Sequence, residues 1–196
     1  MFVDSIDSNI VAATPTWFLP NIADCNSQGL YAFGAHTSLY FMDTADASFK
    51  GILRWSSRIS SVRFSRPGNN ASNSDNSLFV GADDRLAIID ATDGKVLRES
   101  SLKLATGGKH KDKKERLLCG DWESRWETHN SMCFMGTTDD RIVAWNFEGG
   151  QQQLKYLRLT NKSRSHHGGG DSGGLFRQGI TALACHPSIP LRIAFG

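Results

Sequence analysis

Side chains that could act as a nucleophile or as metal ligands gather in one segment, residues 161–174 (NKSRSHHGGGDSGG). Its Asp-Ser-Gly triplet is of the kind that holds a serine nucleophile, but no apolar scaffold flanks the segment and nothing marks a base. His166 and His167 are adjacent, and no cysteine or acid stands at the spacing of a zinc site. The sequence also lacks the phosphate-loop and H-E-x-x-H motifs. We therefore expect a Gly-rich loop here, and a protein that is not an enzyme and that uses no metal or cofactor.

The composition predicts a soluble protein with a core of its own. The chain has 196 residues, 39% of them hydrophobic, and 22 Lys and Arg against 20 Asp and Glu, a net charge of +2. No apolar run approaches the roughly 20 residues that a bilayer span needs, so we expect no membrane association and no secretion. The cysteines are widely spaced and include no C-x-x-C pair. We interpret Cys25, Cys119, Cys133 and Cys185 as buried thiols of a reducing compartment rather than as disulfides or metal ligands.

Two groups of residues could contact nucleic acid. The basic run Lys109, Lys111, Lys113 and Lys114 could bind phosphates, although such runs are also typical of solvated loops and localisation signals. Trp17 and Phe18 lie in TPTWFLP between two prolines, which stiffen the backbone. A rigid aromatic ring can stack on a nucleobase, which contributes about 1–3 kcal/mol per base. The alternative is that Trp17 anchors the segment against the apolar side of the fold.

The elements that would position these residues are short strands. Helical periodicity is almost absent, and the 19 glycines, about a tenth of the chain against a usual ~7%, indicate many turns. Ten runs rich in β-branched or aromatic residues are bounded by turn formers. They are 29–35, 37–43, 59–65, 77–82, 85–90, 132–137, 141–146, 154–159, 180–186 and 191–196. The direct prediction is an all-β fold.

These strands recur as a repeat. DDRLAIID (83–90) aligns with DDRIVAWN (139–146), and RISSVRFS (58–65) aligns with RLLCGDWE (116–123) and GITALACH (179–186). Between the two blocks stands a small run that ends in glycine. Four strands, here called a to d, with an Asp-containing turn between b and c form the layout of a WD40-type β-propeller blade.

The repeat assigns roles to two sets of residues. Glycine at the end of strand b is expected to permit a sharp reversal of the chain; the residues are Gly34, Gly81, Gly136 and Gly196. Large aromatic side chains at repeat positions are expected in the core; the residues are Phe64, Trp122, Phe134 and Trp145.

The expected organisation is an incomplete propeller of about three to four blades. A propeller closes with typically 4–8 blades, so we expect the chain to be the front part of a longer protein. The predicted units are an N-terminal segment with exposed aromatics (1–28), a partial blade (29–57), a blade (58–102), a basic insertion loop (103–114), a blade (115–160), a Gly/His-rich insertion loop (161–178) and the start of a further blade (179–196).

The order of motifs near the N-terminus resembles one family. TPTWFLP, GLYAFGAHTSLYFMD (29–43) and RISSVRFSRPG (58–68) follow one another as in the large WD-repeat, gem-associated subunit of the survival-motor-neuron (SMN) complex. The resemblance implies two joined seven-bladed propellers and a helical region, of which this chain would cover the opening blades. It also implies a cytoplasmic location, with the nucleus as a second compartment.

The resemblance further implies an RNA-binding protein of small nuclear ribonucleoprotein assembly, a step that supplies mRNA splicing. Its partners would be small nuclear RNA, recognised at the Sm site and the cap, and SMN-complex proteins. Trp17 and Phe18 match the family's tandem aromatics and would contact RNA. His36 stands where the family carries arginine, and histidine is mostly uncharged at neutral pH, so its contact with RNA would be weaker. The alternative function is a protein-interaction scaffold without direct RNA contact, since a fold alone does not decide function.

Overall fold

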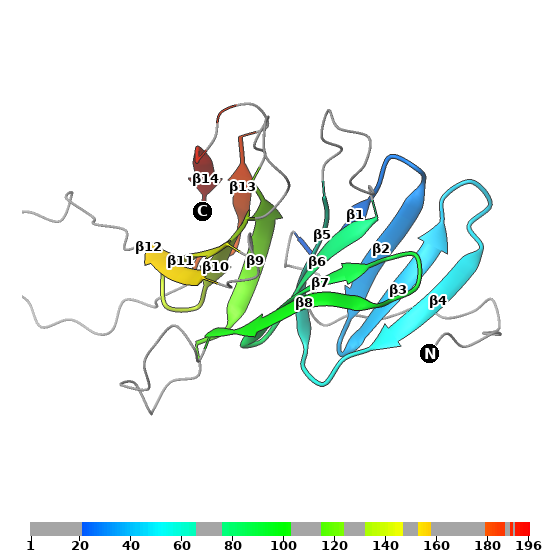
Figure 1. Cartoon of the computed structure of the whole chain (residues 1–196), viewed down its shortest axis with the longest axis horizontal. Coiled ribbons are helices and arrows are strands. Elements are labelled where there is room, and N and C mark those ends of the chain that lie inside the picture. Colours follow the sequence, from blue (N-terminus) through cyan, green and yellow to red (C-terminus); the bar gives the residue numbers. More distant parts are fainter. Residues whose placement is uncertain are drawn as a thin grey trace, which may run out of the picture.

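The computed structural model describes residues 21–65, 76–102, 115–123, 132–146, 153–157, 179–186, 189 and 191–196. They form four antiparallel sheets, which follow one another across the molecule (Figure 1). The strands are β1 (Ala23–Cys25), β2 (Leu30–Ala35), β3 (Ser38–Asp43), β4 (Phe49–Arg54), β5 (Ile59–Phe64), β6 (Ser77–Ala82), β7 (Arg85–Asp90), β8 (Val96–Ser101), β9 (Leu117–Trp122), β10 (Met132–Thr137), β11 (Ile142–Asn146), β12 (Gln153–Leu157), β13 (Leu183–Cys185) and β14 (Ile193–Phe195).

Each sheet is a meander in which strands that are neighbours in sequence pair with one another. Blade 1 contains β1–β4, blade 2 contains β5–β8, blade 3 contains β9–β12, and blade 4 contains β13 and β14. The prediction of an all-β fold built from four-stranded blades is therefore confirmed. The described blades do not close into a ring.

The N-terminal boundary of blade 1 differs from the expected one. The sequence predicts an N-terminal segment up to residue 28, but residues 23–25 form β1, in which Ala23 and Cys25 pair with Phe33 and Tyr31 of β2. Blade 1 thus has four strands rather than a partial set. A strand of three residues, Ala-Asp-Cys, is too short to show alternation, and it is held by pairing to β2 rather than by its own apolar pattern.

Three hydrophobic clusters lie between successive blades and hold them together. The first joins blades 1 and 2, the second joins blades 2 and 3, and the third joins blades 3 and 4. The four aromatic side chains predicted for the core lie in these clusters and are at most 4% exposed, which confirms that prediction; they are Phe64, Trp122, Phe134 and Trp145.

A repeated backbone hydrogen bond also joins each blade to the next. Strand a is the inner strand of each blade (β5, β9 and β13 in blades 2, 3 and 4). A residue at its first position, or a few positions before it, donates its N–H to a carbonyl in or beside the b–c turn of the preceding blade. Ile59 donates to His36 at 2.7 Å, Leu117 donates to Asp83 at 2.7 Å, and Ile180 donates to Thr137 at 3.0 Å. The b–c turns therefore lie at the starting ends of the inner strands.

The repeat glycines do not make the reversals that the sequence predicted. The left-handed conformation in the b–c turns belongs to His36, Asp83 and Asp140, with φ of 52°, 48° and 56°. Gly34 lies inside a strand, where an added Cβ would come within 2.6 Å of Ile59 Cγ2 in the next blade. Close approach between blades, rather than a turn, explains glycine at this position.

A buried polar network closes the b–c side of blade 3. The Glu115 carboxylate, in a residue that is 9% exposed, accepts hydrogen bonds from the Thr137 hydroxyl at 2.7 Å and the Tyr156 hydroxyl at 2.9 Å. The Arg141 guanidinium lies 3.9 Å from the same carboxylate and 5.2 Å from the centre of the Tyr156 ring. The network thus links the start of β9, the end of β10, the b–c turn and β12.

The Tyr156 hydroxyl makes the stability of blade 3 sensitive to alkaline pH. Burial, and then the hydrogen bond to the Glu115 carboxylate, raise the pKa of Tyr156 well above its ordinary value of 10.0. Because the folded state binds this proton more strongly, its contribution to stability is complete below pH 10 and is lost as the pH rises beyond that value. We expect the melting temperature to fall above pH 10 more steeply in the wild type than in Tyr156→Phe. Parallel pH profiles would contradict this assignment.

Candidate interaction surface

The inner strands of blades 1, 2 and 3 end around a small polar pocket of about 210 Å³. It lies at the a–b ends of these strands, opposite to the b–c turns. Its lining residues are Asp24, Cys25, Asn26, Ser27, Arg63, Phe64, Ser65 and Asp121. Most of these side chains are polar, so the pocket offers hydrogen bonds and charge rather than apolar area.

Carboxylates fix the inner strands around this pocket. Asp24 of blade 1 accepts the backbone N–H of Phe64 in blade 2 at 2.9 Å. Asp121 of blade 3 accepts the backbone N–H of Cys185 in blade 4 at 2.8 Å. The same inter-blade hydrogen bond is therefore made by the same strand position in alternate blades.

Arg63 occupies the equivalent position in blade 2, between the two acids. Its guanidinium lies 3.6 Å from the Asp24 carboxylate and donates to the Asn21 side-chain oxygen at 3.1 Å. Its backbone carbonyl accepts the indole N–H of Trp122 at 2.8 Å. The three charged side chains sum to one negative charge, so the pocket suits a polar or cationic group of a ligand.

Sequence reasoning missed this row of charges. The signal was present in the alignment of the inner strands, where Arg63 and Asp121 share one column of otherwise apolar segments. Asp24 could not be aligned with them because β1 was not recognised.

His36 is the predicted site residue that the structure describes. It is exposed in the b–c turn of blade 1, at the end of the inner strands opposite to the pocket. Trp17, Phe18, the basic run with Lys109, Lys111, Lys113 and Lys114, and the His166–His167 pair lie outside the described residues. So does the GDSGG segment (170–174), which fits the G-x-S-x-G spacing in sequence but needs a strand–turn–helix context to act as a nucleophile elbow.

The described ends of the basic segment lie near the b–c turns. Leu102 donates its N–H to the Asp84 carbonyl at 2.8 Å, and Glu115 contacts Thr137 at the end of β10. His36 and the points where the basic segment joins the blades are therefore on the same side of the blade array.

The cysteines are buried with one exception. Cys119, Cys133 and Cys185 lie in the cores between blades, as predicted, whereas Cys25 is exposed at the end of the short strand β1, so its predicted burial was wrong. Burial raises the pKa of Cys119 to about 11 and raises the pKa of Cys133 well above its ordinary value. A protonated thiol is a poor nucleophile.

Thiol labelling should distinguish Cys25 from the other three. We expect iodoacetamide at pH 8 to modify Cys25 in the native chain at least about tenfold faster than Cys119, Cys133 or Cys185, because these are shielded and, at Cys119 and Cys133, held protonated. Labelling followed by peptide mass mapping measures the rates. Unfolding in urea should equalise them, and early labelling of Cys133 in the native chain would contradict the buried arrangement.

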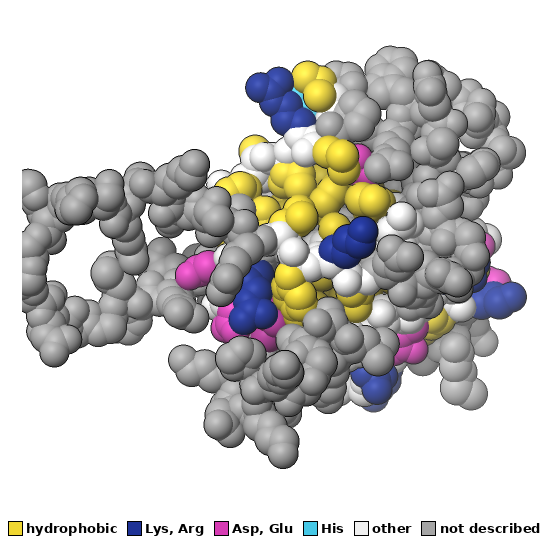
Figure 2. Space-filling model, turned by 60° about the vertical axis from the view of Figure 1, so that its left-hand side comes forward, with side chains coloured by type: hydrophobic (Ala, Val, Ile, Leu, Met, Phe, Trp, Pro, Cys, Tyr) yellow, Lys and Arg dark blue, Asp and Glu magenta, His cyan; other side chains and the backbone are white. Residues whose placement is uncertain are grey.

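Within the described residues, no three His, Cys, Asp or Glu side chains converge as metal ligands would. In the same part of the chain, no helix has the length and apolar character of a membrane span. Among the described residues, large apolar side chains are exposed on β8 (Val96 and Leu97), on β12 (Leu157) and around blade 4 (Ile189, Leu191 and Phe195). Figure 2 shows hydrophobic side chains gathered on the side of the molecule where β12 and blade 4 lie.

Solved β-propellers have a similar fold. The β-propeller domain of Cps50 (Swd1) from Myceliophteria thermophila matches with a TM-score of 0.55 and 15% identity, over 74% of this chain and 41% of that chain. A chain of the mitotic checkpoint complex matches with a TM-score of 0.59 and 16% identity, over 90% of this chain and 43% of that chain. The chain therefore spans less than half the length of either structure.

These likenesses show a WD40-type β-propeller fold. No family model and no curated protein matches the sequence. The comparisons thus support the propeller part of the expected family resemblance, and they add nothing for its link to the SMN complex.

Proposed function

We propose that the chain is a β-propeller scaffold that binds a protein partner. The observation that carries this proposal is the polar pocket at the a–b ends of the inner strands, whose charged walls are held by hydrogen bonds between blades. Asp24 and Arg63 are partly exposed there, and Ser27 is exposed at the wall. One excess negative charge favours a partner that presents a basic side chain.

Site-specific photo-crosslinking tests this proposal. A benzophenone amino acid at Ser27 should give protein adducts in cells, whereas the same residue at Arg98, exposed on the outer strand β8, should give few. Asp24→Asn should reduce the Ser27 adducts if charge guides the partner. Equal adducts at both positions, or none at Ser27, would contradict a partner at the pocket.

A second candidate function is recognition of small nuclear RNA, at the Sm site and the cap, together with SMN-complex proteins in the cytoplasm and the nucleus. The proline-bracketed pair Trp17 and Phe18 favours it, because stiff aromatic rings can stack on bases. The basic segment joins the blades on the same side as His36, and its lysine charges would attract RNA phosphates.

RNA binding by the full chain tests this second function. Trp17→Ala with Phe18→Ala should weaken binding to a capped Sm-site RNA at least about tenfold, as the loss of base stacking requires, without changing the melting temperature. Replacement of Lys109, Lys111, Lys113 and Lys114 by alanine should weaken binding equally for Sm-site and scrambled RNA. Unchanged binding in the aromatic variant would exclude the function, as would mapped RNA crosslinks that avoid residues 14–20.

A further inference from the structure

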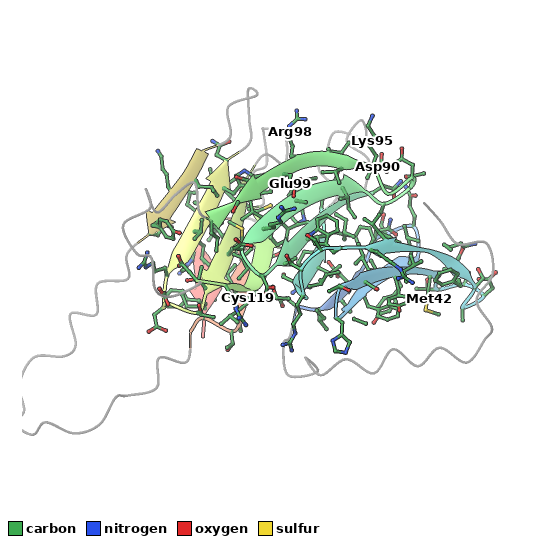
Figure 3. The ribbon with its side chains drawn as sticks, turned by 90° about the horizontal axis from the view of Figure 1, so that it is seen from below. Met42, Asp90, Lys95, Arg98, Glu99 and Cys119 are labelled. Carbon is green, nitrogen blue, oxygen red and sulfur yellow. The ribbon has the colours of Figure 1, made fainter. Side chains whose placement is uncertain are left out.

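The face of blade 1 that points away from blade 2 carries a row of large side chains that no core cluster contains. Strand alternation points Ala32 and Phe41 into the core between blades 1 and 2, so Phe33, Tyr40 and Met42 face the other way. Figure 3 shows Met42 on the side of blade 1 that faces away from blade 2. With Tyr31, these residues form what we call the back face of blade 1.

The rings on the back face are arranged as one surface. The Phe33 and Tyr40 rings stack with centroids 5.0 Å apart and an interplanar angle of 11°. The Tyr31 ring lies 5.7 Å from Phe33. All four back-face side chains are only partly buried, although aromatic and Met side chains contribute strongly to packing when they are fully covered.

The equivalent face is an interface in the other blades. Cross-strand pairs Tyr31–Met42 and Phe33–Tyr40 of blade 1 correspond in register to two pairs in each of blades 2 and 3. All eight of those residues are 0% exposed and pack against the preceding blade; they are Leu78, Ile89, Val80 and Ala87 in blade 2, and Cys133, Trp145, Met135 and Val143 in blade 3. The back face of blade 1 is therefore built to receive a blade in front of it.

Blade 4 exposes the matching front face. Ala184 pairs with Ala194, and both are exposed. The residues equivalent to Ala194 in blades 2 and 3 are Phe79 and Phe134, which are buried against the next blade. Small side chains on blade 4 leave room for the large side chains on the back face of blade 1.

The inner-strand hydrogen bonds are compatible with the same order. Blade 2 has Arg63 in place of the aspartate. In blade 3 the backbone N–H of Trp122 therefore donates to the Asp121 carboxylate of the same blade, at 2.9 Å. Blade 4 has Ala184 at this position. In blade 1 the backbone N–H of Cys25 likewise donates to the Asp24 carboxylate of the same blade, at 3.0 Å. A blade 4 placed before a blade 1 would therefore repeat the junction between blades 2 and 3, with no N–H left unsatisfied at this position.

We propose that the back face of blade 1 binds the front face of blade 4 of a second copy of this chain, so that copies associate head to tail. The occupant is a second copy because this chain itself carries the small-residue face and the hydrogen-bond pattern that fit. A head-to-tail interface leaves one free face at each end and can extend to a ring or a filament.

Sedimentation velocity of the full chain over a range of concentrations tests the proposal. The wild type should form dimers and larger species. Tyr40→Asp and Ala194→Asp should each raise the dissociation constant at least about tenfold, because each places a charge in the centre of the apolar contact. Arg98→Asp, on the exposed strand β8, is the matched control and should associate as the wild type does. Circular dichroism and the thermal melt of each variant verify folding.

Mixing the two variants supplies the decisive measurement. Tyr40→Asp keeps an intact blade 4 face and Ala194→Asp keeps an intact blade 1 face, so an equimolar mixture should form a dimer and nothing larger. A wild type that stays monomeric at all concentrations would overturn the proposal. So would association that survives in both variants, or a mixture of folded variants that forms no dimer.

Discussion

Glu115→Ala is expected to lower the free energy of unfolding by about 3 kcal/mol, because two hydrogen bonds to a buried carboxylate are lost. The substitution would leave the Thr137 and Tyr156 hydroxyls without their acceptor and the Arg141 guanidinium without its nearest buried carboxylate. Hydrogen bonds to a charged group contribute about 1.5–3 kcal/mol, and two are lost together. Because the network joins four segments of blade 3, the loss should loosen the whole sheet.

Urea unfolding followed by tryptophan fluorescence measures this effect, since Trp122 and Trp145 are buried in the core that includes blade 3. Glu99→Ala is the matched control. Glu99 also pairs with an arginine, Arg85 at 3.2 Å, but both side chains are about half exposed. An exposed pair contributes about 0–1 kcal/mol, so this variant should unfold almost as the wild type does. Similar losses in the two variants would show that the Glu115 network is not a buried support.

The repeat made the blade strands predictable, because each contains a run long enough to show its pattern. DDRLAIID and DDRIVAWN became β7 and β11 with their turns, and the aromatic side chains at repeat positions proved to be core. Strand β1 was missed because three residues carry no periodicity. Its place in the sheet follows only from pairing with β2.

The polar pocket was less predictable than the blades. Asp24 and Asp121 are 97 positions apart in sequence, and their common role depends on how inner strands pack side by side. Propensity and alternation describe one strand or one sheet, whereas these hydrogen bonds cross between sheets. A charged residue within an apolar inner strand is the signal that sequence reasoning can use in another protein of this fold.

Gly136→Ala is expected to lower the free energy of unfolding by about 2 kcal/mol, a typical cost of overpacking a core. An added Cβ would lie 2.6 Å from Ile180 Cγ2 and 2.7 Å from both Cys119 Sγ and the Ile180 carbonyl oxygen. The Ile180 backbone cannot retreat easily, because its N–H is bonded to the Thr137 carbonyl at 3.0 Å. The strain therefore falls on the junction between blades 3 and 4.

Two glycines at the same repeat position serve as controls. An added Cβ at Gly81 meets its nearest atom at 3.4 Å, and one at Gly196 meets nothing within 4 Å. None of the three has a left-handed φ, so alanine costs no backbone strain at any of them. Gly81→Ala and Gly196→Ala should leave the free energy of unfolding within about 0.5 kcal/mol of the wild-type value or raise it slightly, since alanine reduces the entropy of the unfolded chain. Equal destabilisation at all three would favour the turn role that the sequence predicted, whereas a loss confined to Gly136 identifies close approach between blades as the reason for glycine there.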